Sequence, residues 1–210
     1  MSADRPGPAS RPPDSGVEGN SRLTSTNGML LLALLAVEGF TVLSVRQMII
    51  LHVFLGILLI GPVPLKIAST AYRFARYYAG APAYVDKGPP HWLLRALGPL
   101  VVLSSLSLLG TGVGLLAVKP AGPGLLLTAH KASFAIWVAV MTLHVLGHLK
   151  GALVTGSREL REANRGLAVR GRGLRLSLMG LALVLGIATA TELLPTASPW
   201  TTRTSTSHDR

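Results

Sequence analysis

Five long apolar blocks constrain the fold of this chain more than any other feature of its sequence. They lie at residues 28–45, 47–65, 98–118, 126–149 and 176–194. Each is close to the roughly 20 residues that an α-helix needs to cross a bilayer, and only a helix satisfies all the backbone hydrogen bonds of a single segment in lipid. The sequence therefore predicts an all-α fold, an integral membrane helical bundle of about five transmembrane helices.

Charged residues are scarce, at 14% of the chain, although the formal net charge is +11. The Lys and Arg residues lie between the apolar blocks, where membrane proteins place them. This arrangement argues against a nucleic-acid partner and makes the lipid bilayer the expected surroundings. The chain has no Cys, which excludes disulfides, iron–sulfur clusters and a thiolate-ligated haem.

The two ends of the chain have a different composition from its middle. Residues 1–27 are rich in Pro, Ser and Gly, and residues 195–210 are rich in Ser and Thr. Such segments cannot bury enough apolar surface to order themselves, so we expect two disordered tails around a transmembrane bundle at residues 28–194.

The second apolar block is expected to continue beyond its last apolar residue. Residues 66–78, KIASTAYRFARYY, keep a helical and amphipathic composition. Pro62 and Pro64 should kink the helix as it leaves the bilayer. The pattern predicts an interfacial extension of the second transmembrane helix on the cytoplasmic side.

Basic residues gather in two of the four connections, between blocks two and three and between blocks four and five. Cytoplasmic loops of membrane proteins carry an excess of Lys and Arg. We therefore expect a multi-pass protein of the cell membrane, with its N-terminus in the cytoplasm and its C-terminus outside.

Block four carries three histidines, His130, His144 and His148, which are 14 and 4 residues apart. At about 100° per residue, His144 returns to within about 40° of His130, and His148 lies almost in line with it. His130 and His144 are then separated by roughly 21 Å along the helix axis. An ionisable residue inside a membrane helix is a candidate functional residue, and imidazoles at two depths on one helix suggest haem ligation.

The predicted orientation places His52 of block two and His130 at similar depths near the outer surface. Two imidazoles on different helices can bind one haem iron as its axial ligands. Gly112 in block three and Gly56, four residues after His52, would leave space for another helix or for a flat macrocycle. The alternative is that the histidines bond to Ser, Thr or backbone carbonyls and that the glycines serve plain helix packing.

A second haem at the depth of His144 would need another ligand. The candidates are His91, in the loop before block three, and His148, whereas block two offers Lys66 and no histidine at that depth. His144 and His148 share one helix, so they cannot occupy opposite axial positions of the same haem. The residues favour one haem b and leave a second one open.

Glu38 is the one acidic residue well inside a predicted span. It could form a pair with Arg46 or with a histidine, or accept a proton during quinone chemistry. A polar contact that serves helix packing is an equal alternative, so its role stays open at the level of sequence.

Two stretches of the chain resemble the bacterial membrane cytochromes b, including ferric-reductase-like and di-haem proteins. One is HKASFAIWVAVMTLHVLGH, which begins at His130, and the other is LHVFLG around His52. The resemblance covers about residues 47–149 and implies one or two b-type haems between helices. It also implies electron transfer, either linked to quinone or as the membrane subunit of an oxidoreductase with a redox partner subunit. Two-haem members usually place four histidines in four bundle helices, and block one here has none.

No hydrolase, kinase or nucleotide-binding motif is present, so no catalytic residue is indicated and enzymatic activity of the chain itself stays open. A second class of function is a cofactor-free polytopic protein. Such a protein would act as an anchor or assembly subunit, or as a small transporter. The presence or absence of a haem spectrum separates the two classes.

Overall fold

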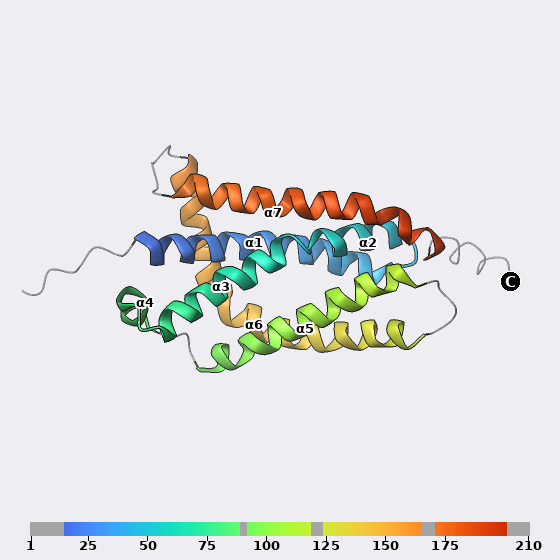
Figure 1. Cartoon of the computed structure of the whole chain (residues 1–210), viewed down its shortest axis with the longest axis horizontal. Coiled ribbons are helices and arrows are strands. Elements are labelled where there is room, and N and C mark those ends of the chain that lie inside the picture. The colour runs from blue at the N-terminus through green and yellow to red at the C-terminus, as the bar shows by residue number, and fades with distance from the viewer. Residues whose placement is uncertain (1–14, 89–91, 119–123, 165–170, 201–210) are drawn as a thin grey trace, which may run out of the picture.

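The computed structural model is an all-α bundle, which confirms the predicted fold class (Figure 1). It describes residues 15–88, 92–118, 124–164 and 171–200, and these contain no β-strand. The helices are α1 (Ser15–Leu43), α2 (Ile49–Leu58), α3 (Pro62–Tyr78), α4 (Pro82–Asp86), α5 (Trp92–Ala117), α6 (Leu125–Asn164) and α7 (Arg172–Leu193), followed by the 3-10 turn η1 (Leu194–Ala197).

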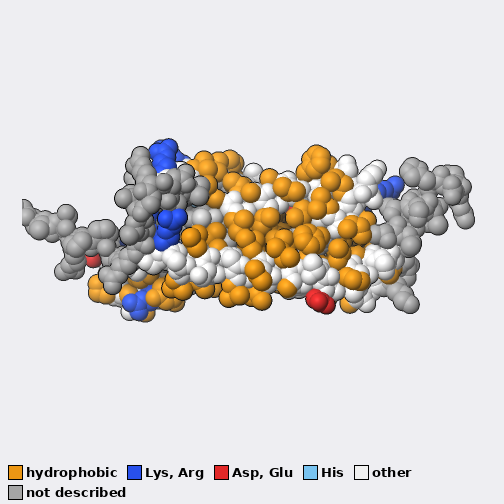
Figure 2. Space-filling model, turned by 90° about the horizontal axis from the view of Figure 1, so that it is seen from above, with side chains coloured by type: hydrophobic (Ala, Val, Ile, Leu, Met, Phe, Trp, Pro, Cys, Tyr) orange, Lys and Arg blue, Asp and Glu red, His pale blue; other side chains and the backbone are white. Residues whose placement is uncertain are grey.

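Five helical segments are long and apolar enough to cross a membrane, as the apolar blocks predicted. They are α1, the combined α2 and α3, α5, the first part of α6, and α7 with the turns that follow it. These segments run lengthwise side by side in Figure 1. Figure 2 shows apolar side chains over the middle of one face and Lys and Arg side chains toward its ends. This distribution of side chains is compatible with a multi-pass membrane protein.

The second span is interrupted between Leu58 and Pro62. Pro62 and Pro64 stand in the first turn of α3, a position that proline tolerates because the first N–H groups of a helix have no partner within it. The kink and the continuation to Tyr78 that the sequence predicted are both present. The break changes the direction of the span and leaves Gly61 at the junction.

Helix α7 packs closely against this junction through small residues. Ala182, Gly186 and Ala190 repeat at every fourth position of α7 and are buried. A Cβ atom on Gly186 would overlap the backbone carbonyl of Leu58, and one on Gly61 would overlap the carbonyl of Ala182. The two backbones therefore touch, which is how small residues drive helix association in membranes.

The beginning of α1 differs from the prediction. Residues 15–27 were expected in a disordered tail, but they form the first turns of a 29-residue helix. Their polar side chains bind α3, where Asn20 donates to the carbonyl of Ser69 (3.1 Å), Thr24 bonds to the Ser69 hydroxyl (3.0 Å) and Asn27 donates to the carbonyl of Pro62 (2.9 Å). Composition alone suggested disorder because these polar groups find their partners far away in the sequence.

The predicted C-terminal tail is also partly ordered. Residues 195–200 continue as helical turns after α7, and the indole N–H of Trp200 donates to the carbonyl of Leu115 on α5 (3.1 Å). The rest of the two predicted tails, residues 1–14 and 201–210, lies outside the described residues.

The bundle has two ends, which we name after the histidines near them. The His130 end is the one where α2 and α6 begin and α5 finishes. At the other, the His144 end, α1 and α5 begin and α3 finishes. Beyond His148, α6 bends, and its last turns cross the His144 end in Figure 1.

Candidate functional site

His52 on α2 and His130 on α6 both lie at the His130 end of the bundle. His52 and Glu38 lie within electrostatic reach of the His130 imidazole. The fold thus places at one end the two histidines that the sequence matched by depth. We refer to His52 and His130 as the histidine pair.

The His52 ring is held by α1. Its Nδ1 lies 2.9 Å from Oε1 of Glu38 and 3.1 Å from Oγ1 of Thr41. The Thr41 hydroxyl donates its hydrogen to the backbone carbonyl of Glu38 (2.6 Å). Since an ionised carboxylate only accepts hydrogen bonds, Nδ1 of His52 carries a hydrogen and donates it. Of the roles considered for Glu38, the structure therefore has it paired with a histidine.

The His130 ring is held by α5. Its Nδ1 lies 3.0 Å from Oγ1 of Thr111. That hydroxyl has one hydrogen, which it donates to the backbone of its own helix, with the carbonyl of Ser107 at 2.7 Å. The Thr111 oxygen therefore accepts, and Nδ1 of His130 is the donor.

The two glycines that the sequence singled out differ in importance. A Cβ atom on Gly112 would come within 3.2 Å of Cε1 of His130, so the absence of a side chain lets the imidazole lie directly on α5. A Cβ atom on Gly56 would lie 3.6 Å from Oε1 of Glu38, an ordinary contact. Gly112 thus positions the histidine pair, whereas Gly56 leaves modest extra space beside it.

Both imidazoles of the histidine pair commit Nδ1 to a protein acceptor. Each ring in its neutral form then has its lone pair on Nε2, and the backbone carbonyl of Leu108 lies within hydrogen-bonding reach of the His130 ring. Histidines that bind metals almost always donate their other N–H to a carboxylate, a carbonyl or a similar acceptor, which fixes the tautomer. Hydrogen bonds of this kind at Nδ1 are common among histidines that bind a metal through Nε2.

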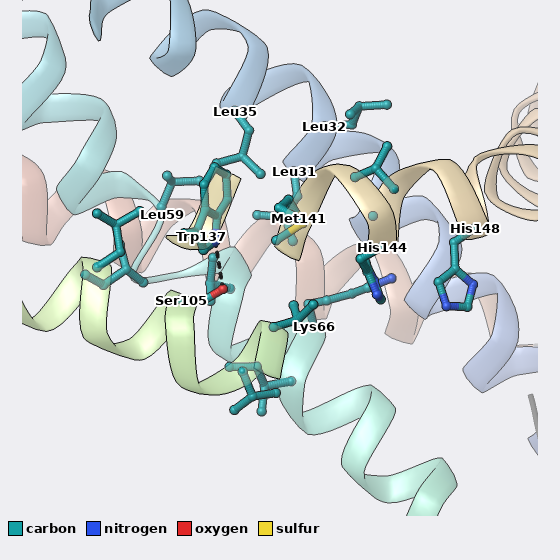
Figure 3. Close-up of a pocket in the computed structure, with 18 of the residues that line it drawn as sticks. Leu31, Leu32, Leu35, Leu59, Lys66, Ser105, Trp137, Met141, His144 and His148 are labelled. Carbon is teal, nitrogen blue, oxygen red and sulfur yellow. Dashed lines mark hydrogen bonds between the residues drawn. The ribbon is translucent and has the colours of Figure 1, made fainter. Parts of the chain in front are cut away.

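The His144 end has a different set of groups. The rings of His144 and His148 are 4.7 Å apart between centroids. Both line a cavity of about 160 Å³ together with Lys66 and Trp137, whose indole N–H donates to Ser105 (3.0 Å), as Figure 3 shows. The structure thus places Lys66 of α3 near His144. No other described helix contributes a histidine there.

Three residues of these sites were missed as functional residues at the level of sequence, namely Thr41, Thr111 and Lys66. Thr111 could have been found, because it stands next to Gly112 at the predicted depth of His130. Thr41 gave a weaker signal, three residues after Glu38. His91, a candidate ligand for a second haem, lies outside the described residues.

Within residues 15–88, 92–118, 124–164 and 171–200, no group of three or more His, Cys, Asp or Glu side chains could hold a metal ion. A haem differs from a bare ion because the protein supplies only the axial ligands of its iron. Comparisons of the chain with protein-family models, with curated proteins and with solved structures found no match. The residues at the two ends of the bundle are therefore the evidence from which a function can be inferred.

Proposed function

We propose that the chain is a b-type membrane cytochrome in which His52 on α2 and His130 on α6 would hold one haem b through their Nε2 atoms. One observation carries this proposal: both rings have Nδ1 within hydrogen-bonding distance of a fixed oxygen on a neighbouring helix, which leaves Nε2 as the nitrogen that could bind a metal. When bound, the haem supplies one-electron redox chemistry.

The neighbouring residues have definite tasks under this proposal. Glu38 and Thr41 orient the His52 ring, and Thr111 orients the His130 ring. A carboxylate bonded to Nδ1 would fix the tautomer of His52 and so leave its Nε2 to the haem iron. Gly112 keeps α5 close to His130 without a side chain between them.

The proposal includes the cell membrane and an orientation in it. Lys66, Arg73, Arg76 and Arg95 lie toward the His144 end, on α3 and α5, and positive charge marks the cytoplasmic side. The N-terminus is then cytoplasmic, the C-terminus is outside, and the haem lies near the outer surface. With haem bound, the site would supply one-electron transfer to or from a quinone or a redox partner subunit of an oxidoreductase.

An optical spectrum of the purified protein tests the haem directly. We expect a reduced-minus-oxidised spectrum of haem b with one haem per chain, and its loss in His52→Ala and in His130→Ala. His148→Ala, which removes an exposed histidine from the other end of α6, should keep the spectrum. Size-exclusion chromatography of the three variants is the control that shows whether each one remains folded.

A colourless wild-type protein would rule this proposal out, and so would a His130→Ala variant that keeps its full haem content. Either result would favour a cofactor-free membrane protein that anchors a partner or transports a small molecule.

A further inference from the structure

The cavity at the His144 end has the features of a second binding site. It lies between α1, α3, α5 and α6, and its volume is about 160 Å³. Most of its lining is apolar, including Leu31, Leu35, Val63, Val101 and Val145. Its basic groups, Lys66, His144 and His148, lie together toward one end in Figure 3. None of the described residues that line it is Asp or Glu.

Lys66 lies in this cavity, and no carboxylate of the described residues forms an ion pair with it. Its Nζ donates to the backbone carbonyl of Thr24 on α1 at 2.6 Å. Gly28, one turn further along α1, makes room for it, because a Cβ atom there would come within 2.9 Å of Nζ. An ammonium group has three hydrogens, so at least one further acceptor can approach Lys66 from the cavity.

His144 adds a second unsatisfied donor or acceptor. Its Nδ1 is buried and has no hydrogen-bond partner among the residues that the structure describes. Lys66 lies within electrostatic reach of His144, and Figure 3 draws the lysine side chain reaching toward that ring. Lys66 and Arg73 also lie within reach of His148. Positive charge in apolar surroundings is costly unless an opposite charge compensates it, so the cavity is suited to an anion.

The spacing of these residues argues against a second iron at this depth. His130 and His144 are 14 residues apart, and so are His52 and Lys66. The structure places Lys66, and no histidine of another described helix, beside His144, where a second haem would need its other ligand. A charged ammonium group has no lone pair to offer a metal, but it binds carboxylate and phosphate oxygens well.

We propose that this cavity binds the head-group end of an amphipathic anion, with its carboxylate or phosphate on Lys66 and His144 and the first carbons of its apolar chain against the leucines and valines of α1 and α5, while the rest of the chain extends out of the cavity. A fatty acid and a lipid with one acyl chain and a phosphate both have this chemistry. The proposal rests on the cavity alone and is independent of a haem at the histidine pair.

Saturable binding of radiolabelled ligands to the purified full chain in an uncharged detergent tests the proposal. The probes are oleate, oleoyl lysophosphatidate and the neutral analogue oleyl alcohol. We expect at least one anion to bind at one molecule per chain, and the alcohol to bind at least about tenfold more weakly. The ratio between the two anions identifies whether the natural head group is a carboxylate or a phosphate.

Variants connect the binding to the cavity. Lys66→Met should weaken binding of the anion by at least about tenfold, the loss expected when one member of a desolvated charge pair is removed. Lys66→Arg should keep most of it. Lys150→Met removes an exposed lysine from the same end of α6 and should leave it unchanged. Met141→Trp keeps the charges but fills the cavity, so it should abolish binding even if Lys66→Met fails to fold.

Several results would overturn the proposal. Equal binding of oleyl alcohol and the anions would show that the head group is not recognised, and unchanged binding in both Lys66→Met and Met141→Trp would place the ligand elsewhere. Competition by a neutral short-chain quinone, or a second haem per chain that disappears in Lys66→Met, would assign the cavity to a different occupant.

Discussion

At the scale of single residues, a threonine decides which nitrogen of His130 is available. Thr111 donates its own hydrogen to α5 and so can only accept from Nδ1. Without this acceptor, the ring can rotate and place its hydrogen on Nε2, which would block ligation.

Replacing Thr111 with Val should therefore lower the affinity for haem b by about 10- to 100-fold, the usual effect of removing a partner that orients a metal ligand. Thr111→Ser keeps the acceptor and should retain the affinity. Titration of haem-depleted protein measures it. Thr142→Val is the matched control, because Thr142 is exposed and its hydroxyl bonds to its own helix. Equal affinities for Thr111→Val and the wild type would mean that Thr111 does not orient His130.

Much of the candidate site could be predicted from residue positions, but not its hydrogen bonds. His52 and His130 followed from depth, because long apolar helices fix the axial position of every residue. The contacts of Thr41, Thr111 and Lys66 depend on how each helix is rotated toward its neighbours. A helix that is apolar on every side has no polar face to mark which side meets its neighbours, so the sequence leaves that rotation undetermined.

At the scale of helices, the contact between α7 and the break in the second span is set by backbone atoms. Leucine, unlike glycine, cannot fit at position 186 beside the Leu58 carbonyl, and backbone cannot yield as a flexible side chain would.

Gly186→Leu should therefore destabilise the bundle by about 3 kcal/mol or more, at the upper end of what overpacking costs. We expect a lower melting temperature and a smaller yield of monodisperse protein. Gly180→Leu is the control on the same helix, since a Cβ atom there meets nothing within 4 Å. Similar melting temperatures for the two variants would show that α7 does not pack as described.

The helices themselves were easier to predict than their ends. Apolar length identified all five spans, because the membrane leaves a segment no other regular structure. The early start of α1 was missed because Asn20, Thr24 and Asn27 have a composition typical of loops, while their hydrogen bonds go to α3. Local composition carries no information about partners that lie far away along the chain.

At the scale of the whole molecule, the two ends differ in charge, and the orientation that follows can be measured. The chain has no cysteine, so single cysteines can be introduced as markers without a background. Gly124 and Arg161 are exposed at opposite ends of α6.

A maleimide that cannot cross membranes should label Gly124→Cys in intact cells. Arg161→Cys should be labelled only after the cells are permeabilised. Full labelling of Arg161→Cys in intact cells would reverse the proposed orientation, and with it the assignment of the histidine pair to the outer surface.

The packing of α7 on the broken span also has a consequence for biogenesis. The ribosome makes α2 and α3 well before α7, so the junction between Leu58 and Pro62 enters the membrane before the helix that covers it exists. Ala182, Gly186 and Ala190 reach it only when the last span has been inserted. A nascent chain halted after α6 would lack the helix that covers this junction, so the packing around Gly61 is complete only once α7 has been made.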